Sequence, residues 1–370
     1  MGRNDNGGVH LRRVGWSRIA LMKIDLGIWD HFERAPDVPV QQQYKQKVEL
    51  ILAAERLGYR HYHIAEHHLT PLDLAPSPSV FLAALAQATS RIRLGTGVFC
   101  LPLYHPVRLV QELAMLDNIA SGRLDIGVGR GIRATEHQWF GVPQDEVQER
   151  FDETIGIIVQ GMSTGRIDHH GRFYDFENLS LDVLPVQRPH PPLWYAGGVE
   201  TAGRNGFNFL GRSPTDAKRY WQLRDEMQGQ PPRFNAHIET PTVALTRHLV
   251  VRESQAEAER IARRSWPVYE SHFFATSVLV NRDGQTAPLQ RERNANLDEM
   301  LKNDRQLIAG TPEMVRERLA QWSEELKDTP GFTFAPAVQW GDISHEEARE
   351  SLGLLAEVLK DLQPAVSSTS

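Results

Sequence analysis

Short β-rich runs alternate with helical patterns along most of this chain, and that alternation restricts its fold more than any other feature. Apolar residues recur at the spacing of one helical face between positions 44 and 52, and Gly58 ends that pattern. Strand–helix alternation predicts a parallel sheet, because a helix carries the chain back to begin the next parallel strand. About eight such units predict a closed (β/α)8 barrel of the α/β class.

The predicted elements can be given by residue range. Strands are expected at 23–29, 60–66, 92–98, 123–129, 193–196, 206–210, 241–251 and 332–338. Helices are expected at 44–58, 78–89, 109–120, 147–162, 214–228, 254–270, 311–327 and 344–360. Asp145 is the expected N-cap of the fourth helix, and Thr311-Pro312 carry both cap and first-turn signals. Two segments interrupt the alternation: a hairpin insertion at 165–178 and a long lid-like loop at 271–300.

The domain organisation follows from length and composition. With 370 residues, of which 41% are hydrophobic, the chain can build one large barrel domain over residues 23–362. Residues 1–22 carry four arginines but lack the apolar run of a signal peptide. We expect them to be a disordered extension, or the product of a start codon assigned too early, with Met22 as the real start. Residues 363–370 are expected to form a disordered tail.

Charge and composition also exclude several classes of function. The net charge of -6 argues against a general nucleic-acid binder, so no nucleic-acid partner is expected. No apolar run approaches the ~20 residues that span a bilayer, and no membrane association is expected. The single cysteine, Cys100, permits neither an internal disulfide nor a thiolate zinc cage. The cytoplasm is the expected location.

The segment from Tyr59 to Thr70 is unusually rich in histidine. Because strand side chains alternate between faces, His61, His63 and His67 share one side, and Tyr62 and Ile64 the other. An imidazole-rich inner side at a strand end suits proton transfer or metal binding. The His61-x-His63 spacing is similar to that of zinc barrel hydrolases, so such an enzyme is one hypothesis. Both histidines lie deeper than the barrel mouth, however, which favours a hydrogen-bonded core role and leaves His67 as the residue at the mouth.

Three strand ends are rich in glycine, at 95–97, 127–131 and 196–198. Repeated glycine in strands marks close approach of another backbone or of a ligand. A flat, bulky ligand across the barrel mouth would need such space, and simple barrel packing is the alternative. A dinucleotide loop is disfavoured, because 127–132 lacks the third glycine of that motif.

Two arginines near these strand ends predict an anion site. Arg130 directly follows the strand that ends at Gly129, and Arg150 lies near the start of a helix, where a positive charge is unfavourable unless an anion offsets it. Residues 197–201 (GGVET) supply backbone N–H groups and a hydroxyl suited to phosphate. The alternative for each arginine is an ion pair, with Glu136, Glu146 or Glu149 as partner.

Taken together, these segments resemble the bacterial luciferase-like flavin monooxygenase family over about residues 23–362. The resemblance is carried by AERLGYRHYHIAEHH (54–68), LGTGVFCLPLYHPVR (94–108), LDNIASGRLDIGVGRG (116–131), FG (140–141) and GTPEMV (310–315). It implies a (β/α)8 barrel, a homodimer, and reduced FMN or, in some branches, the deazaflavin F420.

The resemblance also implies roles for particular residues. His67 matches a proton-transfer histidine beside flavin and substrate, and is the implied catalytic residue. Gly97-Val98 falls where the family often has a non-proline cis peptide, and Gly129 stands where some luciferases have a cysteine. The implied cofactor-binding residues are Gly97, Val98, Gly129, Arg130, Glu136, Arg150, Gly197, Gly198 and Thr201. Of these, Arg130, Arg150 and the 197–201 loop match the phosphate site.

The function implied by the resemblance is that of a two-component monooxygenase. A separate flavin reductase would supply reduced FMN, whose C4a-peroxide, formed with O2, oxygenates a small organic substrate. Hydroxylation, aldehyde oxidation and Baeyer–Villiger insertion all stay open as reaction types. The alternatives are F420-dependent hydride transfer on the same fold, the zinc hydrolase, and a non-catalytic subunit like the luciferase β chain.

Overall fold

The computed structural model describes residues 24–227, 229–275, 278–280, 286–288, 297–303 and 306–362. The predictions made for residues 1–22 and 363–370 lie outside this part of the chain. So does most of the predicted lid-like loop between residues 276 and 296.

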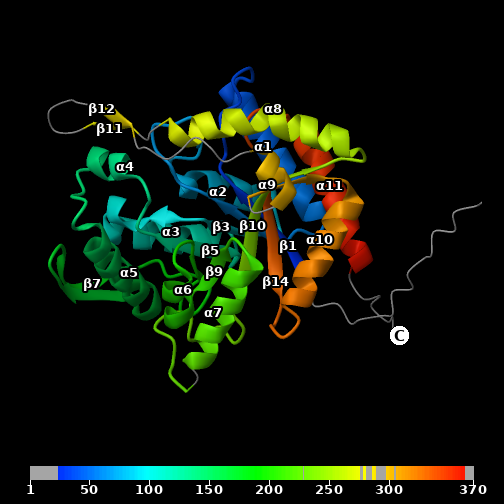
Figure 1. Cartoon of the computed structure of the whole chain (residues 1–370). Coiled ribbons are helices and arrows are strands. Elements are labelled where there is room, and N and C mark those ends of the chain that lie inside the picture. Colours follow the sequence, from blue (N-terminus) through cyan, green and yellow to red (C-terminus); the bar gives the residue numbers. More distant parts are fainter. Residues whose placement is uncertain are drawn as a thin grey trace, which may run out of the picture.

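Eight parallel strands form a closed barrel at the centre of the molecule (Figure 1). They are β1 (Ile24–Asp30), β2 (His61–Ile64), β3 (Arg93–Thr96), β5 (Leu124–Gly129), β8 (Leu193–Tyr195), β9 (Asn208–Gly211), β10 (Val243–Val251) and β14 (Phe332–Ala337). Neighbouring strands in the ring are also neighbours in the chain order of these eight. The ring closes because β10 pairs with both β9 and β14, and β14 pairs with β1. The predicted (β/α)8 barrel is confirmed.

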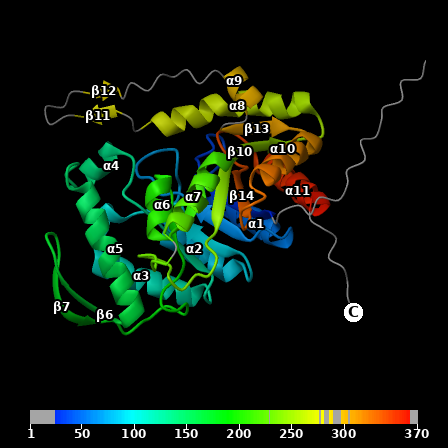
Figure 2. The same ribbon diagram turned by 60° about the horizontal axis from the view of Figure 1, so that its bottom comes forward.

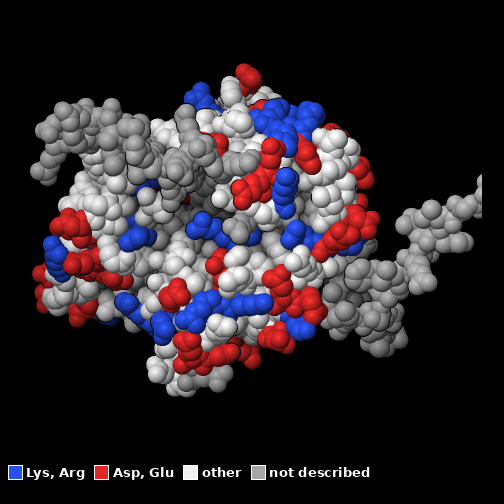
Figure 3. Space-filling view, viewed as in Figure 1, with Lys and Arg blue, Asp and Glu red and all other residues white. Residues whose placement is uncertain are grey.

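Helices surround this barrel and cover the outer faces of its strands (Figure 1). They are α1 (Val40–Arg56), α2 (Pro78–Ala88), α3 (Pro106–Ile119), α5 (Val147–Thr164), α6 (Val199–Asn205), α7 (Pro214–Glu226), α8 (Gln255–Phe274), α10 (Pro312–Glu325) and α11 (His345–Leu362). The views in Figures 1 and 2 both place α8 across one end of the barrel. In the face drawn in Figure 3, basic and acidic side chains are interspersed.

Several further elements decorate the barrel. The predicted hairpin insertion is confirmed as the antiparallel pair β6 (Arg166–His170) and β7 (Asp175–Ser180). Other short elements were not predicted: β4 (Phe99–Cys100), η1 (Leu101–Leu103), α4 (Ala134–Trp139), β11 (Val278–Val280), β12 (Thr286–Pro288), α9 (Leu297–Asn303) and β13 (Leu307–Gly310). Part of the expected loop at 271–300 is therefore regular, since α8 continues to Phe274 and β11 pairs with β12.

One of the two predicted helix caps is wrong. The helix α5 begins at Val147 with Glu146 in the cap position, so Asp145 does not cap it, and no side-chain cap bond is present there. Glu146 instead binds Arg150 one turn later. The other prediction is confirmed, because the Thr311 hydroxyl accepts from the Met314 N–H and Pro312 occupies the first turn of α10.

The alternation of side chains along β2 separates the barrel interior from the helical layer. Tyr62 and Ile64 are fully buried in the apolar layer between strands and helices. The rings of His61 and His63 lie on the interior side, stacked with their centres 6.0 Å apart, and His63 packs 4.6 Å from the ring of Trp194. The predicted division of this strand into two faces is therefore confirmed.

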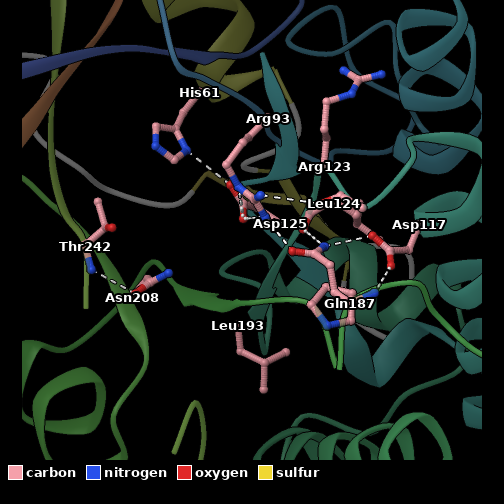
Figure 4. A network of polar contacts seen from close by, with 12 residues as sticks. His61, Arg93, Asp117, Arg123, Leu124, Asp125, Gln187, Leu193, Asn208 and Thr242 are labelled. Atoms are coloured by element: carbon pink, nitrogen blue, oxygen red, sulfur yellow. Dashed lines mark hydrogen bonds and ion pairs between the residues drawn. The ribbon is translucent and has the colours of Figure 1, made fainter. Parts of the chain in front are cut away.

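A buried polar network occupies the interior near the starts of β2, β3 and β5, at the end of the barrel opposite the mouth (Figure 4). Asp125 Oδ2 lies 3.1 Å from His61 Nδ1, and Arg93 Nη2 donates to Asp125 Oδ1 at 2.7 Å. Arg93 also donates to Gln187 Oε1 at 3.0 Å. Burial would raise the pKa of Asp125, but the charge of Arg93 and the hydrogen bond with His61 hold it well below its usual range.

The two interior histidines differ in their hydrogen bonding. His61 pairs with Asp125, as a hydrogen-bonded core role requires. No residue in the described ranges hydrogen bonds to either ring nitrogen of His63. Asp125 Oδ2 comes only within 4.0 Å of His63 Nε2, because Asp125 is engaged by His61 and Arg93. The expected hydrogen-bonded role is therefore right for His61 and wrong for His63. Burial lowers the pKa of His63 to about 3, so this imidazole is neutral at neutral pH.

Glycines allow β3 and β5 to approach each other closely. A Cβ on Gly127 would lie 1.7 Å from the Thr96 carbonyl oxygen, and one on Gly129 would lie 2.5 Å from Val98 Cγ2. The space beside these two glycines is filled by the neighbouring strand. The packing alternative therefore explains them better than a gap left for a ligand.

Candidate functional site

The segment after β2 places His67 at the end of the barrel where the strands terminate. The Ala65 N–H donates to the Asp30 carbonyl, so the pairing with β1 continues briefly past Ile64. The residue His67 is buried, with 7% of its surface exposed. Its Nδ1 is engaged by neighbours, while no described residue hydrogen bonds to its Nε2. Nε2 is therefore the ring nitrogen available to a reactant.

Two charged side chains from the α4 region converge on Nδ1 of His67. Glu136 Oε1 lies 3.2 Å from it, and Arg133 Nε lies 3.3 Å from it. The same Glu136 oxygen accepts from the His68 N–H at 2.9 Å and lies 4.0 Å from Arg133 Nε. These contacts fix the orientation of the imidazole and join the segment after β2 to the segment after β5.

The carboxylate of Glu136 is stabilised in its charged form. Burial by itself would raise the pKa of Glu136. The hydrogen bond and charge interaction with His67, the His68 N–H and the charge of Arg133 outweigh that effect, so the pKa lies below its usual range. Glu136 thus remains a carboxylate at neutral pH.

Arg133 is a site residue that sequence reasoning missed. Its Nη2 donates to the Phe273 carbonyl at 2.7 Å, and its guanidinium lies 5.0 Å from the centre of the Phe273 ring. Arg133 therefore connects His67 to the last turn of α8. The one signal in the sequence was the i,i+3 spacing of Arg133 and Glu136, which is common on helix surfaces and carries little information by itself.

Glu66 and His68 support the segment. Glu66 Oε1 lies 2.9 Å from His68 Nε2, and Glu66 Oε2 accepts from the Cys100 N–H at 3.1 Å. The His68 ring packs against Phe140 with 4.6 Å between ring centres. Burial raises the pKa of the Cys100 thiol well above its usual value, so this cysteine is an inert thiol at neutral pH.

Aromatic and imidazole rings line the interior next to His67. His31 lies 5.4 Å from His67 and 4.4 Å from Trp29, measured between ring centres, and His248 lies 4.3 Å from Tyr269. Among the residues that the structure describes, Nδ1 of His31 and Nε2 of His248 have no hydrogen-bond partner, although both are buried. Burial, followed by the charge of His67, lowers the pKa of His31 well below its ordinary value. A bound molecule with polar edges could satisfy these nitrogens.

The peptide bond between Gly97 and Val98 is cis, as the resemblance implies. It follows β3 at the mouth, and the Gly97 carbonyl accepts from Trp29 Nε1 at 3.5 Å. Gly129 lies at the end of β5 against the Val98 side chain. These three predicted cofactor-binding residues thus lie together where β3 and β5 end.

The Tyr195 side chain lies within the electrostatic influence of Arg130 and of the Thr201 hydroxyl. Arg130 is exposed and forms no ion pair with any residue in the described ranges. Burial raises the pKa of Tyr195, while the charge of Arg130 and a hydrogen bond with Thr201 act in the opposite direction. Arg130 directly follows β5, Tyr195 ends β8 and Thr201 lies in α6, so a cation and two hydroxyl groups lie in one region of the mouth.

The glycines of the predicted phosphate loop lie beside this group. Gly197 and Gly198 are exposed and follow β8 directly, with Gly198 in the cap position of α6. A Cβ on Gly198 would meet no other atom within 4 Å, whereas one on Gly197 would lie 2.6 Å from the Tyr195 ring. The open space at Gly198 leaves the backbone accessible.

Arg150 has other partners. It binds Glu146 with Nη2 2.8 Å from Oε2, and its guanidinium stacks 4.2 Å from the centre of the Phe173 ring. The ion pair considered as the alternative for Arg150 is therefore present, and Glu146 is the partner. The structure shows no contact between Arg150 and Arg130 or the 197–201 loop.

A cavity of about 510 Å³ opens on the outer side of the segment after β2. Leu69, Trp139 and Phe140 lie at its rim with exposed apolar surface, and Asp73 lies deeper. His68 lines this cavity, whereas His67 does not.

The family model for luciferase-like monooxygenases matches residues 24–329. The chain belongs to the luciferase-like monooxygenase family. It is therefore an oxidoreductase of the flavin-dependent monooxygenase type. The family resemblance expected from the sequence is confirmed.

Individual proteins of known activity or structure match nearly the whole chain. The oxygenase component of a flavin-dependent trigonelline monooxygenase from Acinetobacter baylyi is 30% identical over 360 residues, covering 92% of this chain and 94% of that protein. Among solved structures, the FMN-bound oxygenating constituent of 3,6-diketocamphane monooxygenase from Pseudomonas putida has a TM-score of 0.72 at 18% identity, covering 92% of this chain and 99% of that one. An F420-dependent secondary alcohol dehydrogenase has a TM-score of 0.63 at 15% identity, covering 93% and 100%.

Other expectations concern metals and membranes. Within the described ranges, no three His, Cys, Asp or Glu side chains are grouped as ligands of a metal ion. His61 instead faces Asp125, and His67 faces Glu136. In the same ranges, no helix is long and apolar enough to cross a bilayer.

Proposed function

We propose that this luciferase-like protein is the oxygenase component of a two-component, FMN-dependent monooxygenase that acts on a small organic molecule. The observation that carries the proposal is the environment of His67, whose Nδ1 is held by Glu136 and Arg133 while Nε2 is left for a reactant. The name of the trigonelline enzyme, an oxygenase component, supports a separate reductase as the source of reduced FMN. Assembly as a homodimer belongs to the same proposal.

The residues at the mouth fit a flavin. The buried nitrogens of His31 and His248 lack partners within the described part of the chain, as expected where a heteroaromatic ligand with polar edges completes the site. A second group of residues would hold the phosphate of FMN. Arg130, the Thr201 hydroxyl and the exposed backbone at Gly198 match the charge and hydrogen-bonding needs of a phosphate. Reduced FMN, when bound, would supply the two electrons with which O2 reacts, so that one oxygen atom enters the substrate and the other leaves as water.

The residues of the proposed site then have separate roles. His67 would hold or move a proton at Nε2, next to the reacting oxygen. Gly97, Val98 and Gly129 would form a flat backbone surface against the ring system. Glu136 would act on the flavin through His67. Arg150 already uses Nε and Nη2 on Glu146, so we assign it a smaller share of flavin affinity than Arg130.

Anaerobic titration with FMN, reduced FMN and F420 tests the cofactor, and rapid mixing with O2 tests the role of His67. We expect reduced FMN to bind most tightly. The His67→Ala variant should bind it with nearly unchanged affinity, yet react with O2 about 100-fold more slowly, as measured by flavin absorbance. A protein that binds neither form of FMN would refute the proposal, and full reactivity of the variant would remove His67 from the mechanism.

F420-dependent hydride transfer is a second candidate. The similarity of the fold to an F420-dependent alcohol dehydrogenase is the observation that favours it. Tighter binding of F420 than of reduced FMN in the same titration would support this alternative.

A further inference from the structure

We propose that Glu33 and His272 form a latch that fixes the last turn of α8 at the barrel mouth. Through this turn the latch positions Arg133 against His67, so Glu33 is a positioning residue for the site. The latch is a contact between two buried side chains, with His272 Nδ1 2.9 Å from Glu33 Oε2. The inference rests on the proposed function only for its effect on the reaction with O2.

Glu33 lies on the segment after β1 and joins two other parts of the barrel. Besides His272, its Oε2 accepts a hydrogen bond from the Gly341 N–H at 3.0 Å, on the segment after β14. No described residue hydrogen bonds to the other oxygen, Oε1. Within the described part of the chain, the hydrogen bonding of this carboxyl group is therefore made at the oxygen that holds α8.

The burial of Glu33 makes this contact costly to break. Burial raises the pKa of Glu33, while the hydrogen bond and charge of His272 and the Gly341 N–H act in the opposite direction. Moving the end of α8 away would leave the buried carboxyl group with Gly341 as its one described donor. Because a buried polar group that loses its partner is destabilising, the pair keeps the last turn of α8 seated on the barrel.

The last turn of α8 has two further ties to loops at the mouth. The His272 carbonyl accepts from Thr70 Oγ1 at 3.3 Å, and the Phe273 carbonyl accepts from Arg133 Nη2 at 2.7 Å. Thr70 lies after β2 and Arg133 after β5, whereas Glu33 lies after β1. Loops that follow three different strands therefore bind one helical turn, in the helix that crosses this end of the barrel (Figure 2).

Arg133 transmits the position of this turn to His67. Its Nη2 is held by the Phe273 carbonyl and its guanidinium lies on the Phe273 ring. Its Nε lies 3.3 Å from His67 Nδ1. A guanidinium is planar and rigid, so a shift of the Phe273 carbonyl also shifts Nε. Since His272 and Phe273 are consecutive residues, the latch determines where that carbonyl lies.

The latch also fixes part of the aromatic wall beside the site. Tyr269 lies 6.2 Å from His31 and 4.3 Å from His248, measured between ring centres. His31 in turn lies 5.4 Å from His67. Tyr269 comes one turn before His272, so the two side chains face the same side of α8. Release of His272 would therefore loosen this wall together with Arg133.

Hydrogen exchange in the cofactor-free protein tests the latch without any flavin. Glu33→Ala removes both contacts of Oε2, so the amides of residues 270–274 should exchange about 10-fold faster or more. Glu33→Gln keeps an oxygen in that place and should stay close to the wild type. His272→Ala removes the same contact from the side of α8 and should match Glu33→Ala. Unchanged exchange in either folded alanine variant would refute the latch.

Arg264→Met is the matched control on the same helix. Arg264 lies earlier in α8, and its Nη2 binds Glu347 Oε2 at 2.7 Å. The substitution removes an ion pair from α8 but leaves its last turn attached, so exchange in residues 270–274 and the reaction with O2 should keep their wild-type rates. If Arg264→Met and Glu33→Ala had equal effects, any loss of an ion pair from α8 would suffice, and the specific role of Glu33 would be wrong.

The reaction with O2 tests whether the latch acts through Arg133. In Glu33→Ala, reduced FMN should bind with nearly unchanged affinity, while its reaction with O2 falls on the order of 10-fold. Arg133→Met should slow the reaction at least as much, and adding Glu33→Ala to it should cause no further loss. A double variant in which the two losses multiply would contradict this route.

The two kinds of measurement distinguish the latch from the proposed function. If exchange rises as expected but no FMN binds to the wild type, the proposed function fails and the latch stands. If FMN binds and Glu33→Ala reacts with O2 at the wild-type rate, the positioning role fails and the proposed function stands.

Discussion

At the scale of single residues, the contact between β3 and β5 depends on the absence of a Cβ at Gly127. Because a Cβ on Gly127 would lie 1.7 Å from the Thr96 carbonyl oxygen, no side chain fits there without moving a backbone. We expect Gly127→Ala to lower the free energy of unfolding by about 3 kcal/mol or more. The urea midpoint of unfolding measures this loss.

Gly156→Ala is the matched control for that substitution. A Cβ at Gly156 meets no atom within 4 Å, and the residue lies inside α5. Alanine is favoured over glycine in a helix by about 1 kcal/mol, so this variant should be at least as stable as the wild type. Equal destabilisation by both substitutions would show that close packing at Gly127 is not the cause.

The sequence predicted the position of His67 but not its partners. Alternation along a strand shows which ring reaches the mouth, because that depends only on local geometry. The contacts of Arg133 depend on how residues 130–136 bend and on where α8 ends, and neither has a local signature. The lack of a hydrogen-bond partner for the His63 ring among the described residues also has no local signature in the sequence. It follows from the orientation of the Asp125 carboxylate toward Arg93.

At the scale of elements, two similar helix starts should respond differently to substitution. Thr311 and Ser77 each precede a proline in the first turn of a helix, but only Thr311 accepts a hydrogen bond from that turn. Thr311→Ala should therefore cost about 1 kcal/mol of unfolding free energy, and Ser77→Ala clearly less. Chemical denaturation of both variants checks this, and equal losses would contradict the role of the cap bond.

The elements found from the sequence were those with a repeated pattern. Long helices and barrel strands have a period or an apolar run that extends over many residues, which is why the alternation predicted the barrel. Short elements have no such period. The strand β13 is four residues long and exists because it pairs with the second half of β10, and α4 is a helix of six residues. Tertiary contacts created both.

At the scale of the whole molecule, two buried histidines make the fold sensitive to acid. Burial lowers the pKa of His63 and of His248 to about 3, far below the ~6.5 of an exposed imidazole. Unfolding therefore takes up protons below pH ~6.5, and stability present above that pH is lost as the pH falls toward 3. The expected loss at pH 5 is on the order of 2 kcal/mol per histidine. Urea midpoints between pH 7 and pH 5 measure it.

Variants identify the groups responsible. His63→Phe removes one of the buried titrating rings, so its unfolding free energy should depend less steeply on pH than that of the wild type. Met115→Leu, at an exposed residue of α3 that carries no ionisable group, should keep the wild-type slope. Equal slopes in all three proteins would show that His63 does not contribute to acid sensitivity.

The closure of the barrel has a consequence for the synthesis of the protein. One edge of β1 pairs with β2, but its other edge pairs with β14, near the end of the chain. On the ribosome, β14 emerges about 300 residues after β1, which corresponds to roughly 15–60 seconds of translation. During that interval the first strand has an open edge able to pair with strands of other chains. The nascent chain therefore has an exposed strand edge that the folded barrel lacks, and a chaperone that shields β1 would act at this stage.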